Sequence, residues 1–226
     1  MQIRSMLDLF ISIDEMYDYL KDKDITFDEN GLPIFTKDMF LDEWPEMVVP
    51  YSQRKNWRII NPAKTVLCFF GRDKNLYPRI GKVLDEIEEY SLFMGVIGMD
   101  VTVTSDMDEE WQEAIILLNH LFLAVLAVNG IKILLNTRTG GLDPDVIFKN
   151  TPHGVMVAAG FLGCDTTADE CDYSFMKKIL VLLPEKLILY GKHDKIAERQ
   201  LDILGIDFRT YTDFHRLCKE VPYVRQ

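Results

Sequence analysis

The chain has 226 residues, of which 48% are apolar and 27% charged, and this composition excludes a globally disordered protein. Its formal net charge of −11 repels phosphate backbones and anionic lipid surfaces, so we expect neither direct binding of duplex nucleic acid nor a membrane partner. Four cysteines are too few for a disulfide scaffold. The acids are unevenly spread, because residues 1–50 hold 12 acidic and 4 basic residues while the rest of the chain holds 24 acidic and 21 basic residues.

The first part of the chain is predicted to be an amphipathic helix followed by an irregular arm. Residues 22–62 contain a turn signal at Asn30 and Gly31 and four prolines, yet carry too many large apolar residues to stay in water. We therefore expect an acidic N-terminal helix and wrapping arm over 1–61, joined to an α/β domain over 62–226 in one compact unit. Over residues 3–21, apolar side chains recur at spacings of three and four. The predicted stripe consists of Ile3, Met6, Leu7, Phe10, Ile13, Met16, Tyr17 and Leu20.

From residue 62 onward, short apolar runs alternate with helical segments. Continuous apolar runs are typical of parallel strands that are buried on both faces between helices. The fold class predicted is therefore α/β, with a mainly parallel sheet built from about five strand–helix units, as an open sheet or a partial barrel. The expected strands are 65–70, 92–103, 131–135, 154–159, 186–190 and 207–211. The expected helices are 78–90, 108–128, 143–149, 173–183 and 194–204.

The most apolar segment, residues 114–128, is predicted to be a core helix. It has 15 residues and includes Asn119 and His120, so it is too short and too interrupted to span a bilayer comfortably. The N-terminal segment has acids inside its apolar stretch and does not match a secretory signal. We therefore expect a cytoplasmic protein, in a bacterium or in a phage-infected host cell.

The candidate site lies at the carboxyl ends of the predicted strands, where parallel α/β folds bind their ligands. Glycine with polar or charged neighbours follows five consecutive strands, and glycine permits close backbone approach to a ligand. Asp100 interrupts an apolar strand, so it needs a partner, and Arg138 after the next strand is the candidate. This pair is either structural or part of a ligand site, with Asp100 and Arg138 as the candidate catalytic residues. The candidate ligand-binding residues are Asp73, Thr102, Asn136, Gly163 and Gly191.

The sequence lacks the motifs of the common nucleotide-binding, serine-hydrolase and zinc sites. The sequence contains no P-loop, no G-x-G-x-x-G and no G-x-S-x-G. Cys164 and Cys171 have no zinc spacing and are interpreted as part of a solvated acidic loop, and the four histidines are scattered. We therefore expect no metal site, and the sequence identifies no cofactor.

Residues 31–223 resemble the uncharacterised domain-of-unknown-function family 4417 of bacteria, phages and mobile elements. The family's small-residue or serine position after the strand aspartate corresponds to Thr102, whereas the segment NTRTG at 136–140 departs from the family form. The resemblance implies a mobile-element origin and supports the fold, but it adds no mechanism. The matching pieces are GLPIF at 31–35, CFFGRD at 68–73, GMDVT at 98–102, the helix with Asn119 and Gly130, Gly163–Cys164, and LYG at 189–191.

Two functions are consistent with these features, and the sequence leaves open whether the protein is an enzyme. The first is a phage or mobile-element accessory protein that binds a small polar or anionic ligand, such as a nucleotide, at the strand ends. The second is a non-enzymatic acidic protein of the anti-defence or DNA-mimic type, which binds a host protein through its N-terminal region. The acids that favour the second function are Asp14, Glu15, Asp18, Asp22, Asp24, Asp28 and Glu29.

Overall fold

The main feature of the computed structural model is a seven-stranded, entirely parallel sheet whose strands follow one another in chain order. The structure describes residues 3–104, 106–138, 142–161 and 173–220. The predicted α/β class with a parallel sheet is confirmed. The strands are β3 (Met47–Pro50), β4 (Thr65–Phe69), β5 (Gly95–Met99), β6 (Ile133–Asn136), β7 (Met156–Phe161), β8 (Lys186–Gly191) and β9 (Asp207–Tyr211).

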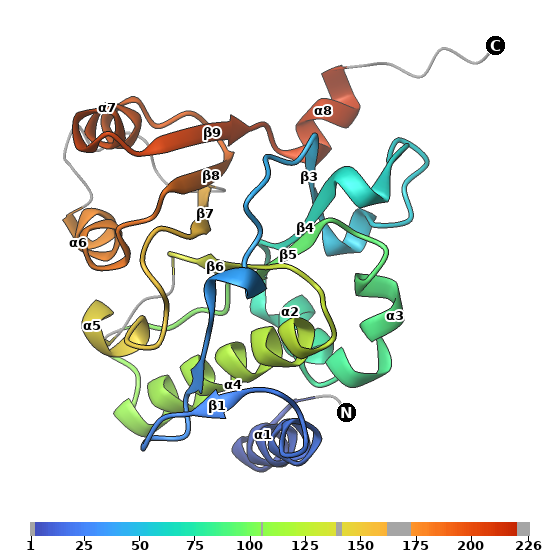
Figure 1. The fold of residues 1–226 in the computed structure, drawn as a ribbon. Helices are drawn as coiled ribbons and strands as arrows, with labels where there is room; N and C mark the ends of the chain where they lie inside the picture. The colour runs from blue at the N-terminus through green and yellow to red at the C-terminus, as the bar shows by residue number, and fades with distance from the viewer. Residues whose placement is uncertain (1–2, 105, 139–141, 162–172, 221–226) are drawn as a thin grey trace.

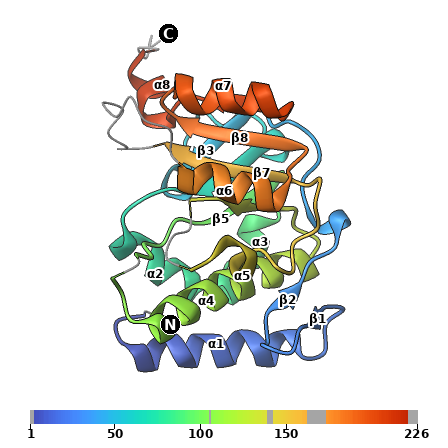
Figure 2. The ribbon, with the colours of Figure 1, turned by 90° about the vertical axis from the view of Figure 1, so that its left-hand side faces the viewer.

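The helices lie around the outer face of this sheet (Figures 1 and 2). Each connection between neighbouring strands therefore crosses on the same side, as right-handed crossovers in a sequential parallel sheet require. The helices are α1 (Met6–Leu20), α2 (Asp73–Ile80), α3 (Ile87–Tyr90), α4 (Glu109–Val128), α5 (Pro144–Ile147), α6 (Tyr173–Leu182), α7 (Lys195–Leu204) and α8 (Phe214–Glu220).

The sheet curls until its inner face closes on itself. The rings of Phe70, directly after β4, and Tyr190, on β8, stack with their centroids 5.6 Å apart, although three strands separate β4 from β8 in the sheet. The two edges also meet, because the Tyr211 hydroxyl donates to the Pro45 carbonyl at 2.8 Å. The inner face forms a core of its own, made of Leu41, Val48, Val66, Cys68, Phe70, Ile97, Leu134, Met156, Ala158, Ile188 and Tyr190.

Strand β3 was not predicted as part of the sheet. It belongs to the stretch interpreted as a wrapping arm, and it pairs with β4 from Met47 opposite Thr65 to Pro50 opposite Cys68. Its apolar residues Met47, Val48 and Val49 stand between Pro45 and Pro50, and proline indicated an irregular segment. Proline is nevertheless tolerated on an edge strand, where its missing N–H has no ladder to break.

An earlier part of the arm forms a small antiparallel hairpin of β1 (Thr26–Phe27) and β2 (Pro33–Ile34). Gly31 has a φ of 78°, a left-handed conformation that suits glycine at this turn. Its carbonyl accepts a 2.5 Å hydrogen bond from the Tyr17 hydroxyl, so α1 fixes the turn of the hairpin.

Helix α4 is largely buried because the sheet covers one face and α1 lies along the opposite face (Figures 1 and 2). It is the single helix within the described residues that is long and apolar enough to cross a membrane, yet 67% of its most apolar window is buried inside the protein. The prediction of a core helix is confirmed. Asp108 caps the start of this helix, and its side chain accepts from the Glu110 N–H.

The predicted stripe of α1 is rotated relative to the observed one. The buried side is formed by Leu9, Ser12, Ile13, Met16 and Leu20, whereas Leu7 and Phe10 are 69% and 47% exposed. Because more than half of the residues of α1 are apolar, apolar side chains at spacings of three and four fit more than one face of this helix. The position of α4 decides which face is buried.

Two further boundaries differ from the prediction. The helix expected over 78–90 starts earlier as α2 and stops at Ile80, so that Pro78 lies inside it rather than in its first turn, and a 3-10 turn and α3 follow. Strand β5 ends at Met99, which pairs with Phe69 as the last pair of β4 and β5 after a register shift between Leu67 and Phe69. Asp100 is therefore the first residue after β5 and not a residue inside the strand.

Candidate functional site

The residues that end or follow the strands share one rim, because all seven strands run in the same direction. Asp73 begins α2 after β4, Asp100 follows β5, Asn136 ends β6 and Arg138 lies two residues later. Gly191 ends β8. The structure therefore places the described members of the predicted site along one edge of the sheet, with Gly163 outside the described residues.

Asp100 is held mainly by the neighbouring strand. Asn136, which is only 3% exposed, donates from Nδ2 to Asp100 Oδ1 at 2.9 Å. The Asn136 Oδ1 accepts from the Arg138 backbone N–H at 2.9 Å, so the buried amide of Asn136 joins the ends of β5 and β6. Burial raises the pKa of the Asp100 carboxyl, and the Asn136 hydrogen bond and the Arg138 charge offset this effect only in part.

Arg138 acts on Asp100 through its charge, and its guanidinium lies over an aromatic ring. Its guanidinium carbon lies 5.3 Å from the ring centroid of Phe161, at the end of β7. Phe161 in turn meets the ring of Phe175 on α6 edge-to-face, with centroids 5.6 Å apart. The cation is thereby placed between the ends of β6 and β7 and beside α6.

Lys178 on α6 is a second cation at this rim, and the sequence analysis did not identify it. It is 7% exposed, and its charge also lowers the pKa of Asp100. A signal was present in the sequence, because Lys178 stands three residues after Phe175 and four before Leu182, which are both buried. A lysine on the buried stripe of a helix has to face a partner or a polar site.

Asp73 and Thr102 contact each other. The backbone N–H and the hydroxyl of Thr102 both donate to Asp73 Oδ1 at 3.1 Å. This pair fastens the segment after β5 to the start of α2, and so keeps Asp100 in place. The charge of Asp73 also adds to the rise in the Asp100 pKa.

Gly191 is buried at the end of β8 with a φ of 122°, a conformation that side-chain-bearing residues rarely adopt. It pairs with Phe161, whose ring faces Arg138. The backbone at this position is therefore restricted to glycine next to the cationic part of the rim.

Within the described parts of the chain, no three His, Cys, Asp or Glu side chains group closely enough to hold a metal ion. His120 belongs to the core, where its Nδ1 lies 2.8 Å from the Ile116 carbonyl and burial lowers its pKa. Cys68 faces the interior of the curled sheet, and burial raises the pKa of its thiol. Cys164 and Cys171 lie outside the described residues.

No protein-family model, curated protein or solved structure matched this chain. The family resemblance of residues 31–223 therefore stays a prediction.

Proposed function

We propose that the protein binds a small polar or anionic ligand at the rim formed by Asp100, Asn136, Arg138 and Lys178. The observation that supports this function most is the state of Asp100, a partly buried carboxyl with a raised pKa that two cations from different elements flank. Carboxyls shifted in this way by burial are frequent at functional sites. The cations suit an anionic group of the ligand, and Asp100 suits a neighbouring group that donates or accepts a proton.

The free-energy cost of burying the Asp100 carboxyl also favours a ligand site. A carboxyl that is buried without full compensation lowers the stability of the fold, and such strain is typical of sites that wait for a ligand. Asp100 orients the ligand in this proposal, and it is positioned to exchange a proton if the ligand reacts. By the resemblance, the protein would be an accessory protein of a phage or mobile element.

The test is a ligand screen with a matched pair of variants. Native mass spectrometry and thermal shift against a library of polar metabolites, including nucleotides, are carried out on the wild type, on Asp100→Asn and on Asp202→Asn. Asp202 is an exposed acid on α7. We expect a ligand that binds the wild type and Asp202→Asn but not Asp100→Asn. A ligand that binds all three proteins equally would place the site elsewhere.

One observation favours the second function, binding of a host protein. The outward face of α1 carries the exposed acids Asp14, Glu15 and Asp18 beside the exposed apolar side chains of Phe10 and Ile11. Apolar side chains rimmed by charge are typical of protein interaction surfaces. A host protein retained by the wild type and lost with the Phe10→Ser, Ile11→Ser double variant would support this function.

A further inference from the structure

A groove runs along the carboxyl ends of β3 and β4, apart from the Asp100 rim. It contains a cavity of about 410 Å³ that opens to solvent, and an adjacent hollow of about 490 Å³ shares part of its wall. The volume lies within the range of small-molecule sites. The residues common to both hollows are Pro50, Ser52, Phe70, Gly71, Lys74 and Asn75.

The cavity is cationic although the chain has a formal net charge of −11. Arg54, Lys74 and Arg79 line it, and its described lining residues include no carboxylate. The adjacent hollow adds Arg72 and one acid, Asp213. Three cations line one concave site, and although carboxylates outside the lining pair with the two arginines, Lys74 adds a positive charge that attracts an anion.

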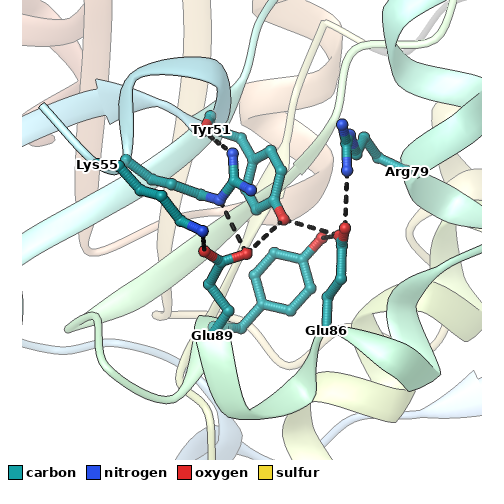
Figure 3. A network of polar contacts seen from close by, with 7 residues as sticks. Tyr51, Lys55, Arg79, Glu86 and Glu89 are labelled. Atoms are coloured by element: carbon teal, nitrogen blue, oxygen red, sulfur yellow. Dashed lines mark hydrogen bonds and ion pairs between the residues drawn. The ribbon is translucent and has the colours of Figure 1, made fainter.

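Glu86 and Glu89, which are not among the lining residues, form ion pairs with the two arginines, and Figure 3 shows the pair of Arg79 with Glu86. Arg79 Nη1 lies 2.7 Å from Glu86 Oε1, and Arg54 Nε lies 2.9 Å from Glu89 Oε2. Both carboxylates accept from the Tyr51 hydroxyl, at 2.7 Å and 3.1 Å. Arg54 Nη1 also donates to the Tyr51 carbonyl at 3.2 Å, so Nη2 of Arg54 and the Nε and Nη2 groups of Arg79 are the ones left for a ligand.

The Tyr51 ring completes this support. It is 4% exposed, and the guanidinium carbons of Arg54 and Arg79 lie 4.0 Å and 5.4 Å from its centroid. The ring also stacks on Phe69 with a centroid separation of 5.0 Å. Because a stacked guanidinium loses little further freedom when it binds an anion, the groove is preorganised.

Lys74 differs from the arginines because it is exposed and forms no ion pair within the described residues. It stands in the first turn of α2, which begins beside the groove and has no side-chain cap. Asn75 and Ser52 add neutral hydrogen-bonding groups, and Phe70 adds an aromatic wall. One part of the groove is therefore lined by cations, and another part is apolar.

We propose that this groove binds the phosphate group of a small phosphomonoester, with Lys74, Arg54 and Arg79 as its ligands. Arginine forks match the oxygens of phosphate, and lysine contributes a point charge. The cavity exceeds what an inorganic anion fills, so the organic part of the ester lies against Phe70 and Pro78. This site is separate from the Asp100 rim, so a negative result for one binding proposal does not contradict the other.

The test measures saturable binding of inorganic phosphate, AMP and adenosine by calorimetry and thermal shift, with chloride at matched ionic strength as the reference. We expect phosphate and AMP to bind and to compete, AMP to bind more tightly, and adenosine not to compete with phosphate. Lys74→Gln should weaken AMP binding about tenfold, the effect of one charge-assisted hydrogen bond. Lys82→Gln, an exposed lysine after α2 that does not line the groove, is the matched control and should bind as the wild type does.

Two further variants keep the proposal falsifiable. The double variant Arg79→Met, Glu86→Gln removes an ion pair as a unit, and it should lose AMP binding while keeping a cooperative melt. Asp100→Asn reports where the anion lies, because retained binding supports the groove and lost binding assigns the anion to the rim instead. The proposal is overturned if neither probe binds saturably above the chloride reference, or if Lys74→Gln and Lys82→Gln bind AMP equally.

Discussion

Phe70 and Gly160 are in contact across the interior of the curled sheet. A Cβ atom at Gly160 would lie 2.5 Å from Cδ1 of Phe70, closer than real side chains approach. The Phe70 ring is also stacked on Tyr190, so it cannot move away without losing that contact. We expect Gly160→Ala to destabilise the fold by about 1–3 kcal/mol through overpacking, measured by urea denaturation.

Two variants check this explanation. Gly71→Ala should be close to neutral, because the nearest atom to its Cβ would be Leu76 Cδ2 at 4.0 Å. Phe70→Leu should recover part of the loss in the Gly160→Ala background, since the smaller side chain leaves room for the methyl group. An additive double variant would contradict the contact.

Replacement of Asp100 should not destabilise the protein at neutral pH. Because burial raises its pKa in the folded state, the unfolded state releases this proton more readily, and stability falls as the pH rises from about 3.8 through the folded pKa. Asp100→Asn removes this penalty and keeps an oxygen that accepts from Asn136. We expect an unchanged or higher melting temperature at pH 7.

A lower melting temperature would instead indicate a structural role for Asp100. If Asp100 and Arg138 form a structural pair, Asp100→Asn and Arg138→Met should each cost about 3–5 kcal/mol, and the double variant should recover much of that loss. Thermal melts of the three variants decide between the two.

Tyr51→Phe should destabilise the protein by about 1–3 kcal/mol, because two partly buried carboxylates lose their shared hydrogen-bond donor. The ring remains, so the stacking on Phe69 and the arginine contacts are kept. Chemical denaturation measures the loss. A neutral result would mean that water replaces the hydroxyl without cost.

Glu89 should make stability fall in acid. Burial raises its pKa, but Lys55, Arg54 and Tyr51 outweigh this and hold the pKa below its usual value of 4.5. Its contribution is therefore complete above about pH 4.5 and is lost as the pH falls through the folded pKa. Melting temperatures from about pH 3 to pH 6 should fall less steeply toward acid in Glu89→Gln than in the wild type. Identical slopes would exclude Glu89 as a source of the acid sensitivity.

Helix α1 provides a matched pair of leucines that tests whether it belongs to the folded unit. Leu9 is fully buried and Leu7 is 69% exposed. We expect Leu9→Ala to cost about 2–5 kcal/mol and Leu7→Ala about 0.5 kcal/mol or less. Equal effects in a denaturation experiment would contradict the packing of α1 on α4.

Local patterns in the sequence were sufficient for the fold class and for most elements of the α/β domain. Continuous apolar runs at β4, β6, β7 and β8 are typical of strands covered on both faces, and caps such as Asp108 mark helix starts by local hydrogen bonds. The placement of Asp100 near the same sheet edge as Asn136 and Arg138 followed from the same patterns, because parallel strands bring their carboxyl ends to one edge, whereas its position just after β5 did not. These features depend on neighbours in the sequence.

Features that depend on distant neighbours came only from the tertiary structure. The short apolar run that ends at Pro50 becomes strand β3 because β4 supplies hydrogen bonds along one edge, and β3 then places Tyr51 and Arg54 in the groove. The buried face of α1 depends on where α4 lies, and Lys178 reaches the rim because α6 packs beside β7. Such contacts join residues that are far apart in the chain, so no local periodicity encodes them.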